Sequence, residues 1–176
     1  MRPVTAAIAT TLCLVGFSPV MAQQAAFQVP QSIRSQHQQI ITRLEHFAES
    51  KDKDSADAAQ KAAAFLKEHY AKEEQFVLPP LGLLPRIAKG KISKNMKPAI
   101  EMADRTKSAL AEFSDDHIKI TSLMNELITA GNRNKDDDLV RLATQVAAQS
   151  LNDVEVNQPT TVLIGDYLRR RFSRGP

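Results

Sequence analysis

Apolar residues recur at steps of three and four along most of the chain, which is the spacing of one face of an α-helix. This pattern predicts four helices, over residues 31–50, 55–77, 97–131 and from 136 past Tyr167. Convincing strand alternation is missing from the same stretch, and no Gly/Ser-rich linker divides it. We therefore expect an all-α fold in which one domain forms an up-down-up-down four-helix bundle.

Helix-breaking residues set the expected boundaries. Pro79 and Pro80 end the second helix, because proline lacks the amide donor and clashes with the preceding turn. Gly131 is expected to end the third helix in a left-handed conformation. The carboxylates of residues 136–138 favour the positive N-terminal end of a fourth helix, and Pro159 should kink that helix.

Polar side chains interrupt the apolar face of every predicted helix. Such residues destabilise a core unless they are paired or bind a metal ion. Helices one and two connect at the same end of the bundle as helices three and four. At a rise of 1.5 Å per residue, the polar side chains on all four helices lie roughly 21–23 Å from that end. One layer should therefore contain His37, His69, His117 and Gln149, with Glu73 and Asp153 one turn further on. His46, half a rotation away from His37, should face solvent.

Three segments carry a resemblance to a known family: residues 32–40, the run from His69 through Glu73 to Pro79, and the run from Asp153 to Pro159 that continues into residues 165–168. In these segments the chain resembles the hemerythrin-like, HHE cation-binding family, over about residues 30–170. Members of that family are four-helix bundles that hold non-haem iron, often as an oxygen-bridged pair. They bind or sense dioxygen, nitric oxide or iron.

The resemblance implies a metal site at five positions that match the family pattern, His37, His69, Glu73, His117 and Asp153. Two departures matter: Gln149 stands where the family has a histidine, and Thr121 stands where true hemerythrins have a second histidine on the third helix. His37, His69 and Glu73, helped by Asp153, could hold one iron ion, because imidazole and carboxylate ligands suit iron. A second ion would have only His117 and bridging carboxylates, so we expect one well-formed site and one weak or empty site.

A metal-free interpretation of the layer stays open, and so does the choice of the acids that face it. The same polar residues could form a hydrogen-bonded network that fixes helix register. Glu155 could turn inward in place of Asp153, and Glu74 could be an outer-sphere or surface acid.

The first 22 residues are expected to be a targeting signal and not part of the folded domain. Arg2 precedes an apolar run, and Ala22 closes a small-residue cleavage signal, which together are typical of a secretory signal peptide. The domain then spans residues 23–176, and cleavage removes Cys13, the only cysteine. This composition excludes a disulfide framework or a thiolate metal cluster and suits an exported, periplasmic protein.

The charge of the chain does little to narrow its function. The formal net charge of +3 gives no argument for nucleic-acid binding. Basic residues gather at one predicted pole of the bundle and acidic residues at the other, which agrees with helix dipoles and allows a weak contact with a membrane surface. The sequence thus predicts an exported metal-binding protein that holds non-haem iron between its helices and could bind or sense iron, dioxygen or nitric oxide. An iron oxidoreductase acting on peroxide or ferrous iron, and a metal-free interaction module, are the alternatives.

Overall fold

A computed structural model describes residues 28–174, and within that range the chain is helical and contains no strand. The all-α expectation is confirmed. No helix in the described range is long and apolar enough to cross a membrane. The predicted signal peptide, with Cys13, lies outside the described residues.

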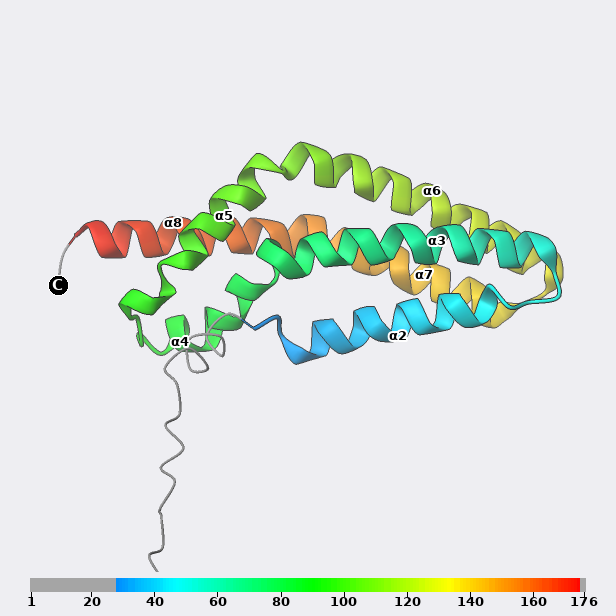
Figure 1. Cartoon of the computed structure of the whole chain (residues 1–176), viewed down its shortest axis with the longest axis horizontal. Helices are drawn as coiled ribbons and strands as arrows, with labels where there is room; N and C mark the ends of the chain where they lie inside the picture. Colours follow the sequence, from blue (N-terminus) through cyan, green and yellow to red (C-terminus); the bar gives the residue numbers. More distant parts are fainter. Residues whose placement is uncertain (1–27, 175–176) are drawn as a thin grey trace, which may run out of the picture.

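Four long helices pack side by side around a common core. They are α2 (Gln31–Phe47), α3 (Lys53–Lys72), α6 (Leu110–Asn134) and α7 (Asp137–Asn152). Each contacts two of the others, because α2 lies against α3 and α7, and α6 lies against α3 and α7 (Figure 1). Asp52 and Asp136 start α3 and α7 by accepting hydrogen bonds from backbone N–H groups three residues on, at 2.8 Å and 3.0 Å.

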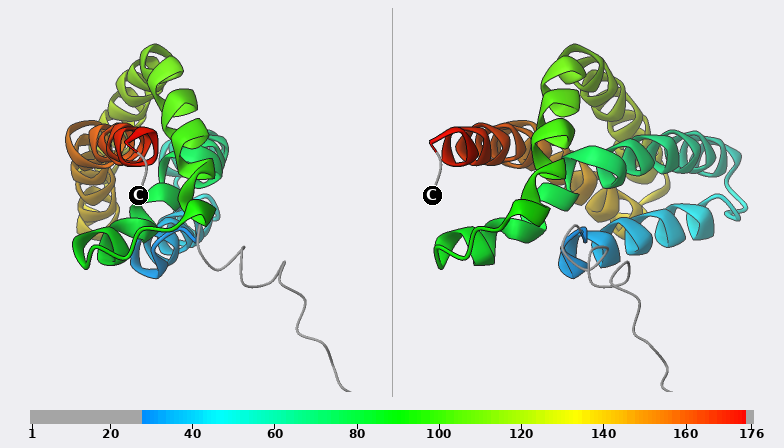
Figure 2. Two further views of the ribbon diagram at one scale, coloured as in Figure 1. Left: turned by 90° about the vertical axis from the view of Figure 1, so that its left-hand side faces the viewer. Right: turned by 60° about the vertical axis from the view of Figure 1, so that its left-hand side comes forward.

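The other end of the molecule is built from a second set of helices. After α3 come a 3₁₀ turn (Pro79–Leu83), the short α4 (Leu84–Ala88), a second 3₁₀ turn (Lys94–Met96) and α5 (Pro98–Ser108). There α5 crosses α8 (Gln158–Ser173) at a steep angle and packs closely on it (Figure 2).

The third predicted helix is in fact two helices. The chain bends at Ala109, between α5 and α6. Just before the bend, Thr106 donates a hydrogen bond back to the carbonyl of Met102 at 3.0 Å, and Ser108 does the same to Asp104 at 3.0 Å. Side chains that bond back to the preceding turn bend helices, so this break has a local cause that hydrophobic spacing does not reveal.

The predicted left-handed cap at Gly131 is wrong. Gly131 lies inside α6, and the left-handed residue is Lys135, with φ of 57°. Asp136 N–H bonds the carbonyl of Gly131 at 2.8 Å, which closes a Schellman motif four residues later than expected. Gly131 serves close packing instead, because a Cβ there would come within 2.8 Å of the Val140 side chain.

Two π-helical segments interrupt the helices at matching places. One, Glu73–Val77, ends α3, and the other, Asp153–Asn157, joins α7 to α8. Each precedes a proline, and the wider turn lets the chain meet that proline without the usual steric clash. At Pro159, where a kink is predicted, the helix therefore contains a π segment just before the proline.

The second π segment also shifts the buried face of α8. An extra residue in the turn moves every later side chain by one position. The three- and four-residue spacing of apolar positions along residues 139–167 would place Val156, Leu163 and Tyr167 on the core face, but all three are exposed. The residues that follow each of them, Asn157, Ile164 and Leu168, are buried instead.

The hydrophobic core is divided into two clusters. One fills the space between α2, α3, α6 and α7 and includes Ile40, Leu66 and Ile120. The other lies at the end formed by α4, α5 and α8 and includes Phe76 and Phe113. Along α6 the change from one cluster to the other falls at His117, and after α3 it falls at Glu73, so the predicted polar layer separates two apolar cores.

Gly165 provides a test of the packing between α5 and α8. A Cβ at this position would overlap the Cβ of Ala103. We expect Gly165→Ala to lower the free energy of unfolding by about 1–3 kcal/mol, although alanine is the better helix former. Urea unfolding measures this, and Ala103→Gly in the same chain should recover most of the loss. Equal stability of Gly165→Ala and the parent would contradict the close approach.

Candidate metal centre

All five predicted site residues are buried, and His69, Glu73 and His117 come together most closely. His37 comes from α2, His69 from α3, and Glu73 and Asp153 each begin a π segment; the fifth, His117, comes from α6. One ligand atom from each of His69, Glu73 and His117 lies within 4.8 Å of the others. His46 is exposed, as predicted, and so is Glu155. The layer inferred from residue counting is therefore present.

The Glu73 carboxylate lies between two imidazoles at ion-pair distance, but no hydrogen bond joins it to either. Its Oε1 is 3.5 Å from Nε2 of His69, and its Oε2 is 4.0 Å from Nε2 of His37. No hydrogen bond satisfies these four atoms, which are fully buried. Apart from Nε of Arg34, the other unpartnered buried side-chain atoms in the described range are both amide atoms of Gln149, in the same layer.

Unpartnered buried polar atoms are costly, at about 1–3 kcal/mol each. Native structures keep such groups satisfied by protein, water or a bound ion. A cluster of two imidazole nitrogens and two carboxylate oxygens that face one another is the donor set of a transition-metal site. These residues therefore fit a bound metal ion.

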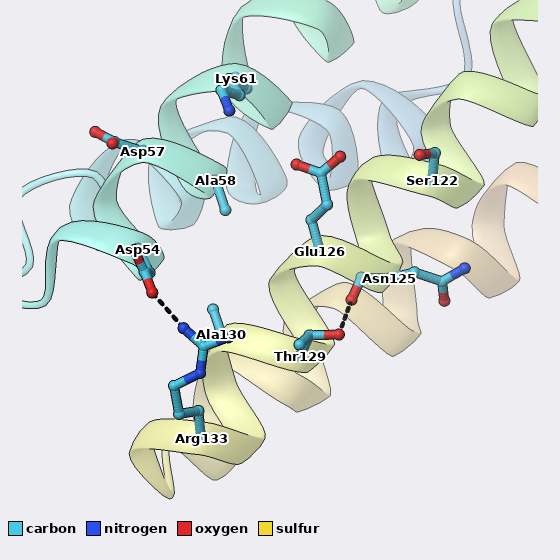
Figure 3. A pocket seen from close by; sticks show the side chains of 10 residues that line it. All are labelled: Asp54, Asp57, Ala58, Lys61, Ser122, Asn125, Glu126, Thr129, Ala130 and Arg133. Atoms are coloured by element: carbon cyan, nitrogen blue, oxygen red, sulfur yellow. Dashed lines mark hydrogen bonds and ion pairs between the residues drawn. The ribbon is translucent and has the colours of Figure 1, made fainter.

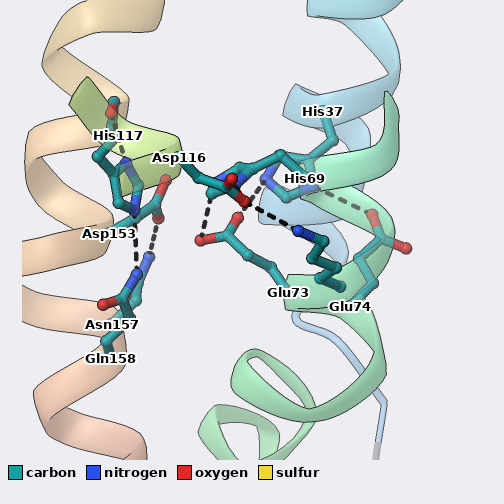
Figure 4. A network of polar contacts seen from close by, with 11 residues as sticks. His37, His69, Glu73, Glu74, Asp116, His117, Asp153, Asn157 and Gln158 are labelled. Carbon is teal, nitrogen blue, oxygen red and sulfur yellow. Dashed lines mark hydrogen bonds and ion pairs between the residues drawn. The ribbon is translucent and has the colours of Figure 1, made fainter. Parts of the chain in front are cut away.

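Each histidine is oriented by a partner on the outer side of its ring. His37 Nδ1 lies 3.1 Å from Oε1 of Glu74, and His69 Nδ1 lies 3.1 Å from Oδ2 of Asp116. His117 Nδ1 lies 2.6 Å from the hydroxyl of Ser150. Figure 4 shows the first two acids on the outer side of their histidines. Such outer partners fix the tautomer that leaves Nε2 free to bind a metal.

Two other members of the layer, His117 and Asp153, have hydrogen-bond partners within the protein. The Gln158 side-chain amide donates to Nε2 of His117 at 3.0 Å, and the Asn157 amide donates to Oδ1 of Asp153 at 2.6 Å (Figure 4). His117 therefore carries its proton on Nδ1 and donates it to Ser150. His117 and Asp153 are thus occupied, whereas the atoms around Glu73 are not.

The site residues repeat along the chain with a fixed offset. The distance in sequence from His37 to His117, from His69 to Gln149 and from Glu73 to Asp153 is 80 residues in each case. The two π segments and the prolines that follow them keep the same offset. We call His37, His69 and Glu73 the first half-site, and His117, Gln149 and Asp153 the second half-site.

The repeat shows where the two half-sites differ. Positions 77 and 78 carry valine and leucine, and their equivalents 80 residues later are Asn157 and Gln158. These two carboxamides are the groups that occupy Asp153 and His117. The second half-site thus has Gln149 where the first has an imidazole, and its other two side chains have internal partners.

Burial and charge shift the ionisation of the acids in opposite directions. Burial, reinforced by repulsion from Glu73, raises the pKa of Asp153 to about 7. Burial also acts on Asp116, but hydrogen bonds from His69 and Lys72 outweigh it and lower the pKa of that carboxyl. Asp116, at the edge of the layer, is therefore fully charged at neutral pH, in contrast to the buried Asp153.

The histidines divide in the same way. Burial lowers the pKa of His37 and of His117, which favours their neutral, metal-binding form. Burial opposes charge on His69 too, but contacts with Glu73 and Asp116 prevail and raise its pKa. A metal ion at the first half-site would replace that proton.

Several contacts in the layer could not be read from sequence spacing. Glu74 was considered as an outer acid, but Asp116, Ser150, Asn157 and Gln158 were not. Asp116 immediately precedes His117, yet it serves His69 on another helix. Asn157 and Gln158 face inward because of the π segment. The one available signal was the 80-residue offset, which places carboxamides opposite apolar residues.

Two further features border this layer or lie apart from it. Tyr70 stacks on His37, with ring centroids 3.7 Å apart and planes within 5°, so its role is to hold that imidazole in place. A polar groove between α3 and α6, lined by Asp54, Asp57, Lys61, Glu126 and Arg133 among others, shares no residue with the layer (Figure 3). Within it, Arg133 pairs with Asp54.

Comparisons of the chain with protein-family models, with curated proteins and with solved structures gave no match. The argument for function therefore rests on the geometry of the site.

Asp153 should make the stability of the metal-free protein depend on pH. The folded state keeps a proton on this carboxyl up to about pH 7, whereas the unfolded chain releases it near pH 3.8, so the contribution of Asp153 to the free energy of unfolding falls as pH rises between these values. We expect Asp153→Asn to stabilise the protein on the order of 2 kcal/mol at pH 8 and much less at pH 5.

Urea unfolding at the two pH values measures this difference. Glu155→Gln, two residues away on the solvent side, is the matched control and should show no such change. If the Asp153→Asn variant and the parent were equally stable at pH 8, the proposed ionisation of the buried acid would be wrong.

Proposed function

We propose that this chain is a metal-binding protein whose first half-site holds one non-haem iron ion. The observation that carries the proposal is the cluster of unpartnered buried atoms, Nε2 of His37, Nε2 of His69 and both oxygens of Glu73. Without an ion these atoms have no hydrogen-bond partner and only the longer ion-pair contacts of Glu73 with the two imidazoles, and with an ion they are ligands. The donor set of imidazole and carboxylate suits iron.

We further propose that the four packed helices form an up-down-up-down bundle of the hemerythrin-like class. The ring of contacts between α2, α3, α6 and α7 supports this arrangement, as does a polar layer to which α2, α3 and α6 contribute and which the π segment after α7 completes. In that class the bound iron supplies open positions for a small diatomic molecule. Export to the periplasm remains part of the proposal, on the strength of the first 22 residues.

The protein's own residues have separate tasks in this function. Glu74 and Asp116 accept hydrogen bonds from the outer nitrogens of His37 and His69, and so raise the basicity of the inner nitrogens. Tyr70 fixes the His37 ring by stacking. The apolar clusters on either side exclude water and keep the site's dielectric low.

The contrast between the half-sites supports one ion and not two. A second ion would have to displace Gln158 from His117 and Asn157 from Asp153, and it would find Gln149 where an imidazole is needed. Reversible dioxygen carriage by a stable iron pair is therefore not part of the proposal. Binding or sensing of iron, dioxygen or nitric oxide at a single ion is.

Metal analysis of the protein purified after growth in iron tests the proposal directly. We expect about one iron per chain, with His37→Ala and His69→Ala each losing most of it because each removes one of few ligands. His46→Ala, which changes an exposed histidine on the same helix as His37, should keep its iron. Less than about a tenth of an iron per chain, in the parent and in Gln149→His alike, would reject the metal-binding function.

The outer acids allow a second test. Asp116→Asn and Glu74→Gln keep the side-chain size but remove the charge behind each imidazole, so metal affinity should fall about 10-fold or more. Competition with a coloured chelator measures the change. Glu112→Gln is the control, since Glu112 also pairs with Lys72, at 2.6 Å, but touches no histidine. Unchanged affinity in both acid variants would mean that these contacts serve folding alone.

A further inference from the structure

His117 has two possible partners for its Nε2, a metal ion and the Gln158 amide, and it can bind only one of them at a time. Its ring lies in the cluster with His69 and Glu73 that could hold a metal ion. Its Nε2, the nitrogen on the inner side, is already the acceptor of the Gln158 amide at 3.0 Å, and its Nδ1 is held by Ser150. His117 cannot ligate through Nε2 while Gln158 stays in place.

The equivalent contact is missing from the first half-site. His37 is the counterpart of His117 at the 80-residue offset, and its Nε2 has no hydrogen-bond partner. The counterpart of Gln158 is Leu78, whose buried side chain has no polar atom to offer. Gln158 is therefore a specific addition to the second half-site and not a consequence of the fold.

The structure also provides space for the Gln158 side chain to leave. Gln158 forms part of the wall of a groove of about 540 Å³ between α6 and α8. The rest of that wall is largely apolar and includes Leu110, Val154, Pro159 and Leu163. A side chain released from His117 could extend into this groove without crossing the core.

We propose that Gln158 is a positioning residue that competes with the metal ion for His117. With Gln158 on His117, the ion has two imidazoles, from His37 and His69. With Gln158 turned into the groove, His117 becomes a third imidazole ligand and binding is tighter. This inference rests on the proposed metal-binding function and adds to it a built-in control of affinity.

The decisive variant is Gln158→Leu, which copies the residue at the equivalent position of the first half-site. We expect metal affinity, measured with Co²⁺ by chelator competition, to rise about 10-fold, the order expected when one competing hydrogen bond is removed. His117→Gln in the same chain should abolish that gain. Gln145→Leu changes an exposed glutamine on α7 and should leave affinity unchanged.

Paramagnetic NMR of the Co²⁺ protein supplies a readout that a merely structural role would not move. Each bound imidazole shifts its own outer N–H proton, so about two strongly shifted signals are expected in the parent and about three in Gln158→Leu. Gln158→Met, of similar volume, replaces the leucine variant if that variant does not fold.

The outcomes separate the two proposals. A gain that persists with His117→Gln, or no gain in Gln158→Leu while the parent binds metal, overturns the role of Gln158 and leaves the metal site standing. Absence of metal from the parent and from Gln158→Leu alike overturns both.

Discussion

The cost of placing polar groups between two apolar cores is the constraint on which this molecule depends. The layer contains imidazoles and carboxylates that are nearly inaccessible to water, and every such group must find a partner or lose stability. The periphery of the layer meets this requirement with Glu74, Asp116 and Ser150, which hold the outer side of each histidine. The inner side meets it only in part, and the unpartnered atoms that remain define where a metal ion would be stabilising.

The two π segments connect this constraint to the backbone. Each begins at the acid of its half-site and ends just before a proline, so the helix widens where the acid must face inward. Widening leaves carbonyl groups without helical donors, and threonines on other helices supply them: Thr161 donates to the carbonyl of Val77 at 2.5 Å, and Thr106 lies 3.4 Å from that of Phe76. The polar layer and the packing of α5 and α8 on the segments that follow α3 are thus one cooperative arrangement.

The 80-residue repeat makes the two half-sites comparable position by position, and the comparison shows which substitutions make them differ. Two helical hairpins present equivalent positions to one layer, yet only the first keeps imidazole and carboxylate atoms without hydrogen-bond partners. In the other, a glutamine replaces an imidazole, and two carboxamides replace apolar side chains and satisfy what is left. The hydrogen bonds to His117 and Asp153 stabilise the second half-site without a metal ion, and they occupy atoms that a metal ion would need.

The sequence alone determined the helical class, the buried layer and its five ionisable members, because hydrophobic spacing and residue counts along straight helices follow from fixed helix geometry. It also placed His46 in solvent. Only the tertiary structure decided the break at Ala109, the cap at Lys135 and the one-residue shift of the buried face of α8, since each depends on a local hydrogen bond or an extra residue in a turn. The partners of the histidines were likewise beyond the sequence, because Asp116 serves a histidine on another helix, and only the packing of α3 against α6 brings the two together.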